Sequence, residues 1–106
     1  MGEWQTEAEF TKNLNTTFRV QLDGAKPVDL TLVAVTPRPS ETHEAAGMER
    51  FSAMFSGPSD LFLPQQSYRI AHEVMGEFEV FLVPIAKEKD GFKYEAVYNY
   101  FKESAQ

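Results

Sequence analysis

Runs of alternating apolar and polar residues constrain this chain more than any other feature. Phe18, Val20 and Leu22, for example, each follow a polar residue. A period of two places these side chains together on one face, which is typical of a half-buried β-strand. The pattern recurs, so we expect strands at about residues 17–22, 28–35, 50–56, 67–72, 77–85 and 92–100.

Short turn sequences separate several of these runs. Asp23-Gly24 follows the first run and Asp90-Gly91 precedes the last, and both are pairs that favour tight hairpins. Hairpin-length connections imply antiparallel neighbours. We therefore predict a mainly β fold, a six-stranded antiparallel barrel or sandwich-like meander. We favour the barrel because closure hides strand edges in a chain rich in aromatic residues.

One short helix precedes the strands. Thr6-Glu7-Ala8-Glu9 has the form of a capping box, in which the Thr6 side chain accepts a hydrogen bond from the Glu9 backbone. Phe10 and Leu14 then lie four residues apart on one helical face. We expect a helix over residues 7–14 that covers the sheet with this face and with Trp4.

Length and composition predict a single small β domain spanning residues 1–106. The chain is 42% hydrophobic, which is enough material for one core in a domain of this size. It has no cysteine, which removes disulfides and thiolate chemistry and suits a reducing compartment. With no apolar run long enough to span a membrane and no secretory signal, we expect a cytoplasmic protein.

The charge balance argues against two classes of partner. The net charge is −6, so the average field repels a phosphate backbone and an anionic membrane surface. We therefore expect no nucleic-acid and no membrane partner. The acidity itself is sufficiently explained as a means of keeping a small domain soluble.

Candidate catalytic groups are few. The two histidines, His43 and His72, could in principle meet with neighbouring carboxylates, but their spacing matches no zinc site. Glu77 and Glu79 share one strand face, where outward-facing charges are the ordinary arrangement. The sequence contains no nucleophile elbow around a serine and no phosphate-binding loop. We expect no enzyme activity, no metal and no cofactor.

Two apolar features suggest binding instead. Leu61, Phe62 and Leu63 form a short apolar segment before Pro64, and it either plugs an open barrel end or serves as a docking anchor. Tyr98 and Tyr100 end an aromatic ladder whose hydroxyls could reach a partner. Residues 32–35 and 81–85 are apolar on both faces, more than one small core needs.

These features lead to two hypotheses. The first is an interaction or assembly module that binds a protein partner or itself through Leu61, Phe62, Leu63, Tyr98 and Tyr100. The alternative is a small-ligand-binding β-barrel. Its pocket would be lined by the aromatic side chains of the inward faces, namely Phe51, Phe55, Tyr68 and Tyr94.

Several stretches together resemble an uncharacterised bacterial all-β domain family, a domain of unknown function. They are Phe18-Arg19-Val20, Phe51 to Pro58, Leu63-Pro64-Gln65, Tyr68-Arg69-Ile70, Gly76 to Pro84 and Tyr94 to Asn99. Gln66 stands where the resemblance leads us to expect a glycine. The family implies no activity, ligand or catalytic residue, and it suggests an accessory role in phage-tail-like or collar-type assemblies.

Overall fold

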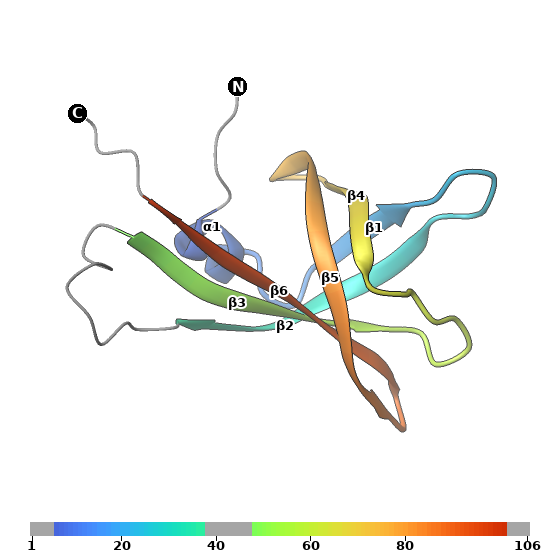
Figure 1. Ribbon diagram of the computed structural model, residues 1–106. Coiled ribbons are helices and arrows are strands. Elements are labelled where there is room, and N and C mark those ends of the chain that lie inside the picture. Colours follow the sequence, from blue (N-terminus) through green and yellow to red (C-terminus); the bar gives the residue numbers. More distant parts are fainter. Residues whose placement is uncertain (1–5, 38–47, 102–106) are drawn as a thin grey trace.

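The computed structural model describes residues 6–37 and 48–101, with the backbone alone for residues 48, 49, 100 and 101. One short helix precedes six strands (Figure 1). In chain order the elements are α1 (Glu7–Lys12), β1 (Thr17–Gln21), β2 (Val28–Pro37), β3 (Met48–Gly57), β4 (Gln66–His72), β5 (Gly76–Glu88) and β6 (Gly91–Phe101).

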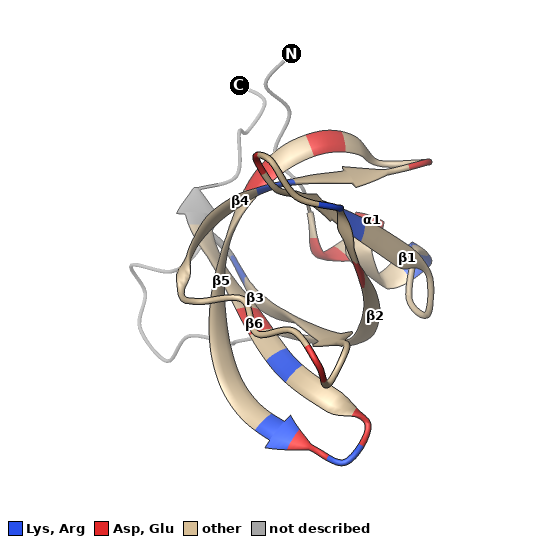
Figure 2. Cartoon of the chain, turned by 90° about the vertical axis from the view of Figure 1, so that its right-hand side faces the viewer, with Lys and Arg blue, Asp and Glu red and all other residues tan. Residues whose placement is uncertain are grey.

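The six strands form a closed antiparallel barrel in the order β1-β2-β3-β6-β5-β4. Figure 2, which looks along the barrel, shows the strands as a ring. The predicted six-stranded antiparallel fold with an N-terminal helix is confirmed, and the barrel is the form it takes. The chain departs from a continuous meander at one place, because β3 pairs with β6 and β4 pairs with β1. The barrel is thus two three-stranded meanders joined edge to edge.

Glycines make the tight turns of the hairpins. Gly24, Gly76 and Gly91 all have positive φ angles, of 69°, 83° and 139°. Gly24 and Gly91 belong to the two Asp-Gly pairs that the sequence singled out. Residues with a Cβ rarely adopt this backbone region, so the turn positions and the strand registers depend on these glycines.

The strand alternation sorts side chains between the lumen and the outside. On β5, for example, Phe78, Val80 and Leu82 are buried, whereas Glu79 and Phe81 between them are exposed. The same rule holds on β1 and β4, as the sequence predicts, whereas on β3 Ser52 is buried as well as its neighbours Phe51 and Ala53. The buried side chains form one hydrophobic cluster: Phe10, Phe18, Val20, Val28, Leu30, Leu32, Phe51, Ala53, Phe55, Leu63, Tyr68, Ile70, Phe78, Val80, Leu82, Tyr94 and Ala96.

Helix α1 closes one end of this cluster. The Thr6 Oγ1 accepts a hydrogen bond from the Glu9 amide at 3.1 Å, which confirms the predicted N-cap. The Phe10 ring is fully buried and lies within 6.4 Å, between centroids, of rings contributed by four strands. Trp4, which we expected to help the helix cover the sheet, lies outside the described residues.

The helix ends two residues earlier than expected, at Lys12. Asn13 is the C-cap, and its side-chain amide donates to the Glu9 carbonyl at 2.8 Å. Asn15 follows with a φ of 67°, and its amide donates to the Leu32 carbonyl at 2.7 Å. This left-handed residue leads the chain into β1 while bonding to β2, so Leu14 packs at the margin of the core rather than in a further helical turn.

Several strands run further than the alternation alone indicated. β2 continues to Pro37, which lies opposite Phe51, and β5 continues to Glu88, which lies opposite Gly91. Pairing with a neighbour supplies backbone hydrogen bonds that the hydrophobic pattern does not reveal. Most of the predicted long loop, residues 38–47, lies outside the described part of the chain.

Candidate functional site

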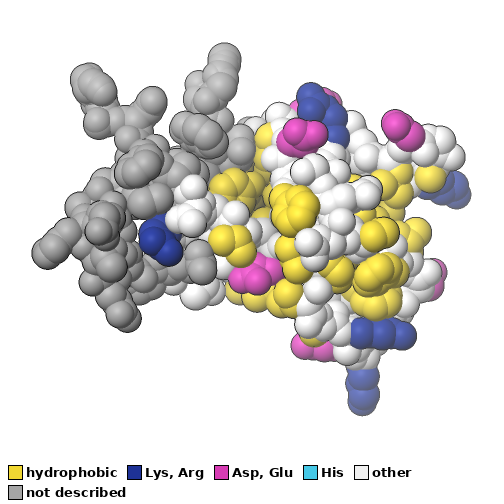
Figure 3. Space-filling view, viewed as in Figure 1, with side chains coloured by type: hydrophobic (Ala, Val, Ile, Leu, Met, Phe, Trp, Pro, Cys, Tyr) yellow, Lys and Arg dark blue, Asp and Glu magenta, His cyan; other side chains and the backbone are white. Residues whose placement is uncertain are grey.

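Large apolar side chains are exposed along one side of the barrel. Phe81 and Ile85 on β5, Val97 on β6 and Phe62 between β3 and β4 are each 46–51% exposed. We call these four residues the apolar band. Figure 3 shows hydrophobic side chains gathered over β5 and over the adjoining segment between β3 and β4.

Strand pairing explains why the apolar band lies outside. Phe81 alternates with the buried Val80 and Leu82, so its side chain must point away from the lumen. Val97 follows the buried Ala96 in the same way on β6. At Pro84/Ala86 the register between β5 and β6 shifts, and Ile85 lies within this irregularity with its side chain exposed.

The segment at 61–64 contains both buried and exposed apolar side chains. Leu63 is buried, and its amide donates to the Tyr94 hydroxyl at 2.9 Å. The Tyr68 hydroxyl donates to the Pro64 carbonyl at 2.6 Å. Phe62 points the other way, exposed, with its ring 5.2 Å from that of Phe92. Leu63 therefore has the burial expected of a plug, whereas a docking role for Phe62 stays a prediction.

Both tyrosine hydroxyls that hold this segment are harder to ionise than an ordinary tyrosine. Burial raises the pKa of Tyr68 and of Tyr94 above the ordinary value for tyrosine. Leu61, the remaining residue of the predicted segment, is 38% exposed beside Phe62. Leu63 and Pro64 are thus each held by one hydrogen bond, to Tyr94 and Tyr68 respectively, while the Phe62 side chain is exposed.

The two remaining candidate residues lie near the C-terminal end of β6. Tyr98 is half-buried, and its ring stacks on Phe51 at 4.8 Å and lies 5.4 Å from Phe10. Most of this ring therefore belongs to the wall of the core. Tyr100 lies opposite Glu49 in the β3–β6 ladder, and its side chain is outside the described part.

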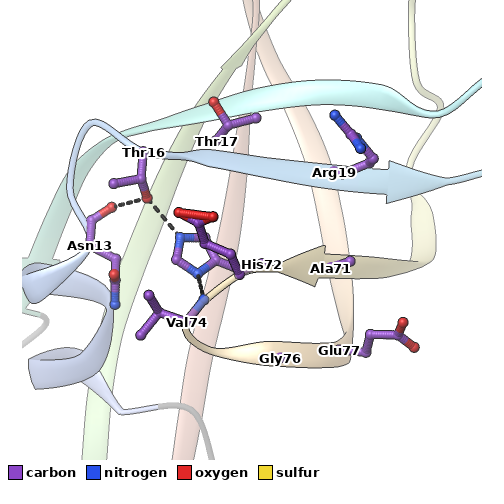
Figure 4. A pocket seen from close by; sticks show the side chains of 10 residues that line it. Asn13, Thr16, Thr17, Arg19, Ala71, His72, Val74, Gly76 and Glu77 are labelled. Carbon is purple, nitrogen blue, oxygen red and sulfur yellow. Dashed lines mark hydrogen bonds between the residues drawn. The ribbon is translucent and has the colours of Figure 1, made fainter.

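A pocket with several polar lining residues lies at the His72 end of β4 (Figure 4). Asn13 and Thr16 contribute from the α1–β1 loop, and His72 and Glu73 from the β4–β5 turn. The His72 Nδ1 accepts hydrogen bonds from the amides of Val74 and Met75, at 3.0 and 3.1 Å.

The other ring nitrogen of His72 is also occupied. Because Nδ1 accepts two bonds, the ring proton belongs on Nε2, which donates to the Thr16 Oγ1 at 2.8 Å. The Thr16 hydroxyl in turn donates to the Asn13 carbonyl at 2.6 Å. Burial lowers the pKa of His72, although Glu73 opposes the shift. His72 thus ties the helix end to the turn as a neutral ring, a role that spacing along the sequence could not reveal.

The other candidate catalytic groups are dispersed. Glu77 forms an exposed ion pair with Arg69 at 3.7 Å, and Glu79 lies opposite Arg69 in the β4–β5 ladder. His43 lies outside the described residues. Within residues 6–37 and 48–101, no group of three or more potential metal-ligating side chains comes together.

The aromatic residues proposed to line a ligand pocket fill the barrel instead. Phe51, Phe55, Tyr68 and Tyr94 are all buried, at 4% exposure or less, within the one hydrophobic cluster. Phe55 meets both Phe10 and Phe18 ring to ring. Their own side chains therefore occupy the space that a ligand would need.

A protein-family model matches most of this sequence. It matches residues 6–98, from the N-cap of α1 to Tyr98 on β6. The chain belongs to the family DUF6916. The DUF6916 model is described as a domain of unknown function, in agreement with the resemblance seen in the sequence. No curated protein and no solved structure shows a significant match. In the described part of the chain, no helix is long and apolar enough to cross a membrane.

Proposed function

We propose that this domain is a non-enzymatic interaction module that binds a protein partner, or a second copy of itself, through the apolar band. The observation that carries the proposal is the band itself, four large apolar side chains half exposed beside a core that is already filled. Large apolar side chains that gather on an exposed face mark protein contact sites. The aromatic residues Phe62 and Phe81 would supply most of the binding energy.

Charges next to the band support a protein partner with a largely neutral surface. Lys93 is paired with Glu88 at 3.3 Å and with Asp90 at 2.9 Å, and Arg69 is paired with Glu77. Some of the charges that a partner would meet on these strands are therefore already paired within the chain. The net charge of −6 disfavours nucleic acid and anionic membranes as partners.

A non-enzymatic role is supported by the polar groups. Both ring nitrogens of His72 are hydrogen-bonded within the fold, and the carboxylates on β5 are exposed. A small-ligand-binding barrel gains no support from the lumen, which is filled by side chains. The cysteine-free composition suits the cytoplasm, and an accessory subunit of a phage-tail-like or collar-type assembly is one setting for such a module.

Site-specific photo-crosslinking in native cells tests the proposal. A photoreactive residue replaces Phe81 in one variant and Val33, which is 40% exposed on β2, in a control. We expect crosslinked protein adducts from position 81 and at least a tenfold lower yield from position 33. A Phe62→Ser substitution should lower the yield at position 81. Equal yields at both positions, or no adduct at either, would overturn the proposal.

A further inference from the structure

His72 links two parts of the chain that are far apart in the sequence (Figure 4). Its Nδ1 accepts hydrogen bonds from the amides of Val74 and Met75, at 3.0 and 3.1 Å, and so holds the β4–β5 turn. Its Nε2 donates to the Thr16 hydroxyl at 2.8 Å, which in turn donates to the Asn13 carbonyl at the end of α1. One neutral ring therefore fastens the turn to the segment between α1 and β1.

Protonation of the ring breaks the half of this link that faces the turn. Nε2 already carries a proton, so a second proton binds only at Nδ1. A protonated Nδ1 is a donor and the two amides that face it are donors too, so both bonds are lost in one step. The His72 ring is only 7% exposed and lies 4.2 Å, between centroids, from the Phe18 ring. The new charge therefore reaches water only if the turn moves.

Charged side chains around the ring set the pH at which this happens. Among the described residues, those that line the same pocket are Arg19 on β1, Glu73 in the turn and Glu77 on β5, while the end of α1 presents the uncharged Asn13. The first and the last of the three form ion pairs with other residues. Burial lowers the pKa of His72 below 6.5, and Glu73 opposes this only in part. The link is therefore intact at neutral pH and is lost as the pH falls through the pKa of the folded state.

We propose that His72 is an acid-sensitive latch, whose protonation at Nδ1 frees the β4–β5 turn from the end of α1 while the barrel stays closed. This inference is independent of the apolar band. The β4–β5 ladder pairs residues 66–72 with residues 76–82 through the backbone and not through the ring, so the opening stops at the turn. Met75, which packs against the core, is the apolar side chain that the released turn uncovers. A fall in pH thus changes the surface at this end of the barrel without unfolding it.

Amide hydrogen exchange followed by NMR over a series of pH values gives the first test. The protection of the Val74 and Met75 amides should fall by about tenfold or more as the His72 ring titrates, as the loss of two hydrogen bonds predicts. The Leu32 amide, which donates to the Thr16 carbonyl at 3.2 Å, should stay protected. Unchanged protection of the two turn amides through the titration overturns the latch. An equal fall at Leu32 also overturns it, because the change is then general unfolding.

Three substitutions give the second test. His72→Asn keeps an acceptor that can bond to the turn amides but does not titrate, so the pH step in exchange at Val74 should vanish. Glu73→Gln removes the charge that favours the protonated ring, so the step should move to lower pH. His43→Gln is the matched control and should leave the step in place. A step that persists in His72→Asn, or that disappears in His43→Gln, overturns the latch. If His72→Asn does not fold, a step that fails to move down in Glu73→Gln overturns it.

Discussion

Replacing Phe10 with alanine should destabilise the whole barrel, because this single side chain closes one end of the core. The ring is fully buried and contacts aromatic residues from β1, β3, β5 and β6. Returning a phenylalanine of this kind to water costs about 1.5–3 kcal/mol. The cavity left behind raises the expected loss to about 3–5 kcal/mol for a Phe→Ala change.

A loss of this size is large for such a domain. Folded domains are stable by about 5–15 kcal/mol, so Phe10→Ala should remove a substantial fraction of the total. Each kcal/mol lowers the unfolding midpoint by about 4 °C or more in a domain of this length, which predicts a fall of at least about 12 °C. Urea denaturation followed by tyrosine and tryptophan fluorescence measures the free energy directly.

Two control variants make the result interpretable. Val74→Ala removes a side chain that is 71% exposed and should change stability by no more than about 0.5 kcal/mol. Phe10→Leu keeps most of the buried volume and should cost less than Phe10→Ala. If Phe10→Ala costs under about 1 kcal/mol, helix α1 is a separately docked lid and the reasoning that places it in the cooperative core is refuted.

Three further predictions follow from the turn, the hairpins and the helix cap. Folding lowers the pKa of His72 below its ordinary value of 6.5. The contribution of His72 to the free energy of unfolding is therefore complete above pH 6.5, and it decreases as the pH falls toward the pKa of the folded state. The stability difference between the native chain and His72→Phe should therefore shrink on acidification, and a difference independent of pH would contradict this. Gly91→Ala should cost about 2 kcal/mol or more, because a Cβ there meets the Gly57 carbonyl oxygen and the φ is 139°. Gly24→Ala, with no atom near the new Cβ, should cost about 1 kcal/mol, and equal losses in thermal denaturation would refute the steric argument. Thr6→Ala should cost about 1 kcal/mol through loss of the N-cap, as measured by urea unfolding, and no change would show that the cap is not required.

Local patterns in the sequence predicted the elements and the inward faces well. The alternation at Phe78, Val80 and Leu82 predicts burial because a strand has a period of two, and all three side chains are buried. The capping box and the Asp-Gly pair at Gly24 act over a few residues, so they can be read directly from the chain. The sequence predicts a helix that ends at residue 14, whereas α1 ends at Lys12. The chain leaves the helix where the Asn15 amide bonds to the Leu32 carbonyl, a contact with no signal in the local sequence.

The candidate site was predictable in part. The doubly apolar stretch at 81–85 indicated surplus hydrophobic surface, and Phe81 and Ile85 are indeed exposed. The sequence could not show which side chains of the 61–64 segment are buried and which are exposed, because Leu63 is held by the Tyr94 hydroxyl, 31 positions away. The role of His72 likewise depends on Thr16, 56 positions away in the chain.

The sequence by itself determined that this chain forms six antiparallel strands with a capped helix, because periodicity, turn glycines and capping act between near neighbours. Tertiary structure decided which strands meet. The pairing of β3 with β6 and of β1 with β4 depends on how the two meanders pack around one set of aromatic rings. These contacts join residues far apart in the sequence, so no local pattern predicts them. That choice also determines which strands lie side by side, and with it where Phe81, Ile85 and Val97 are exposed on the outside of the barrel.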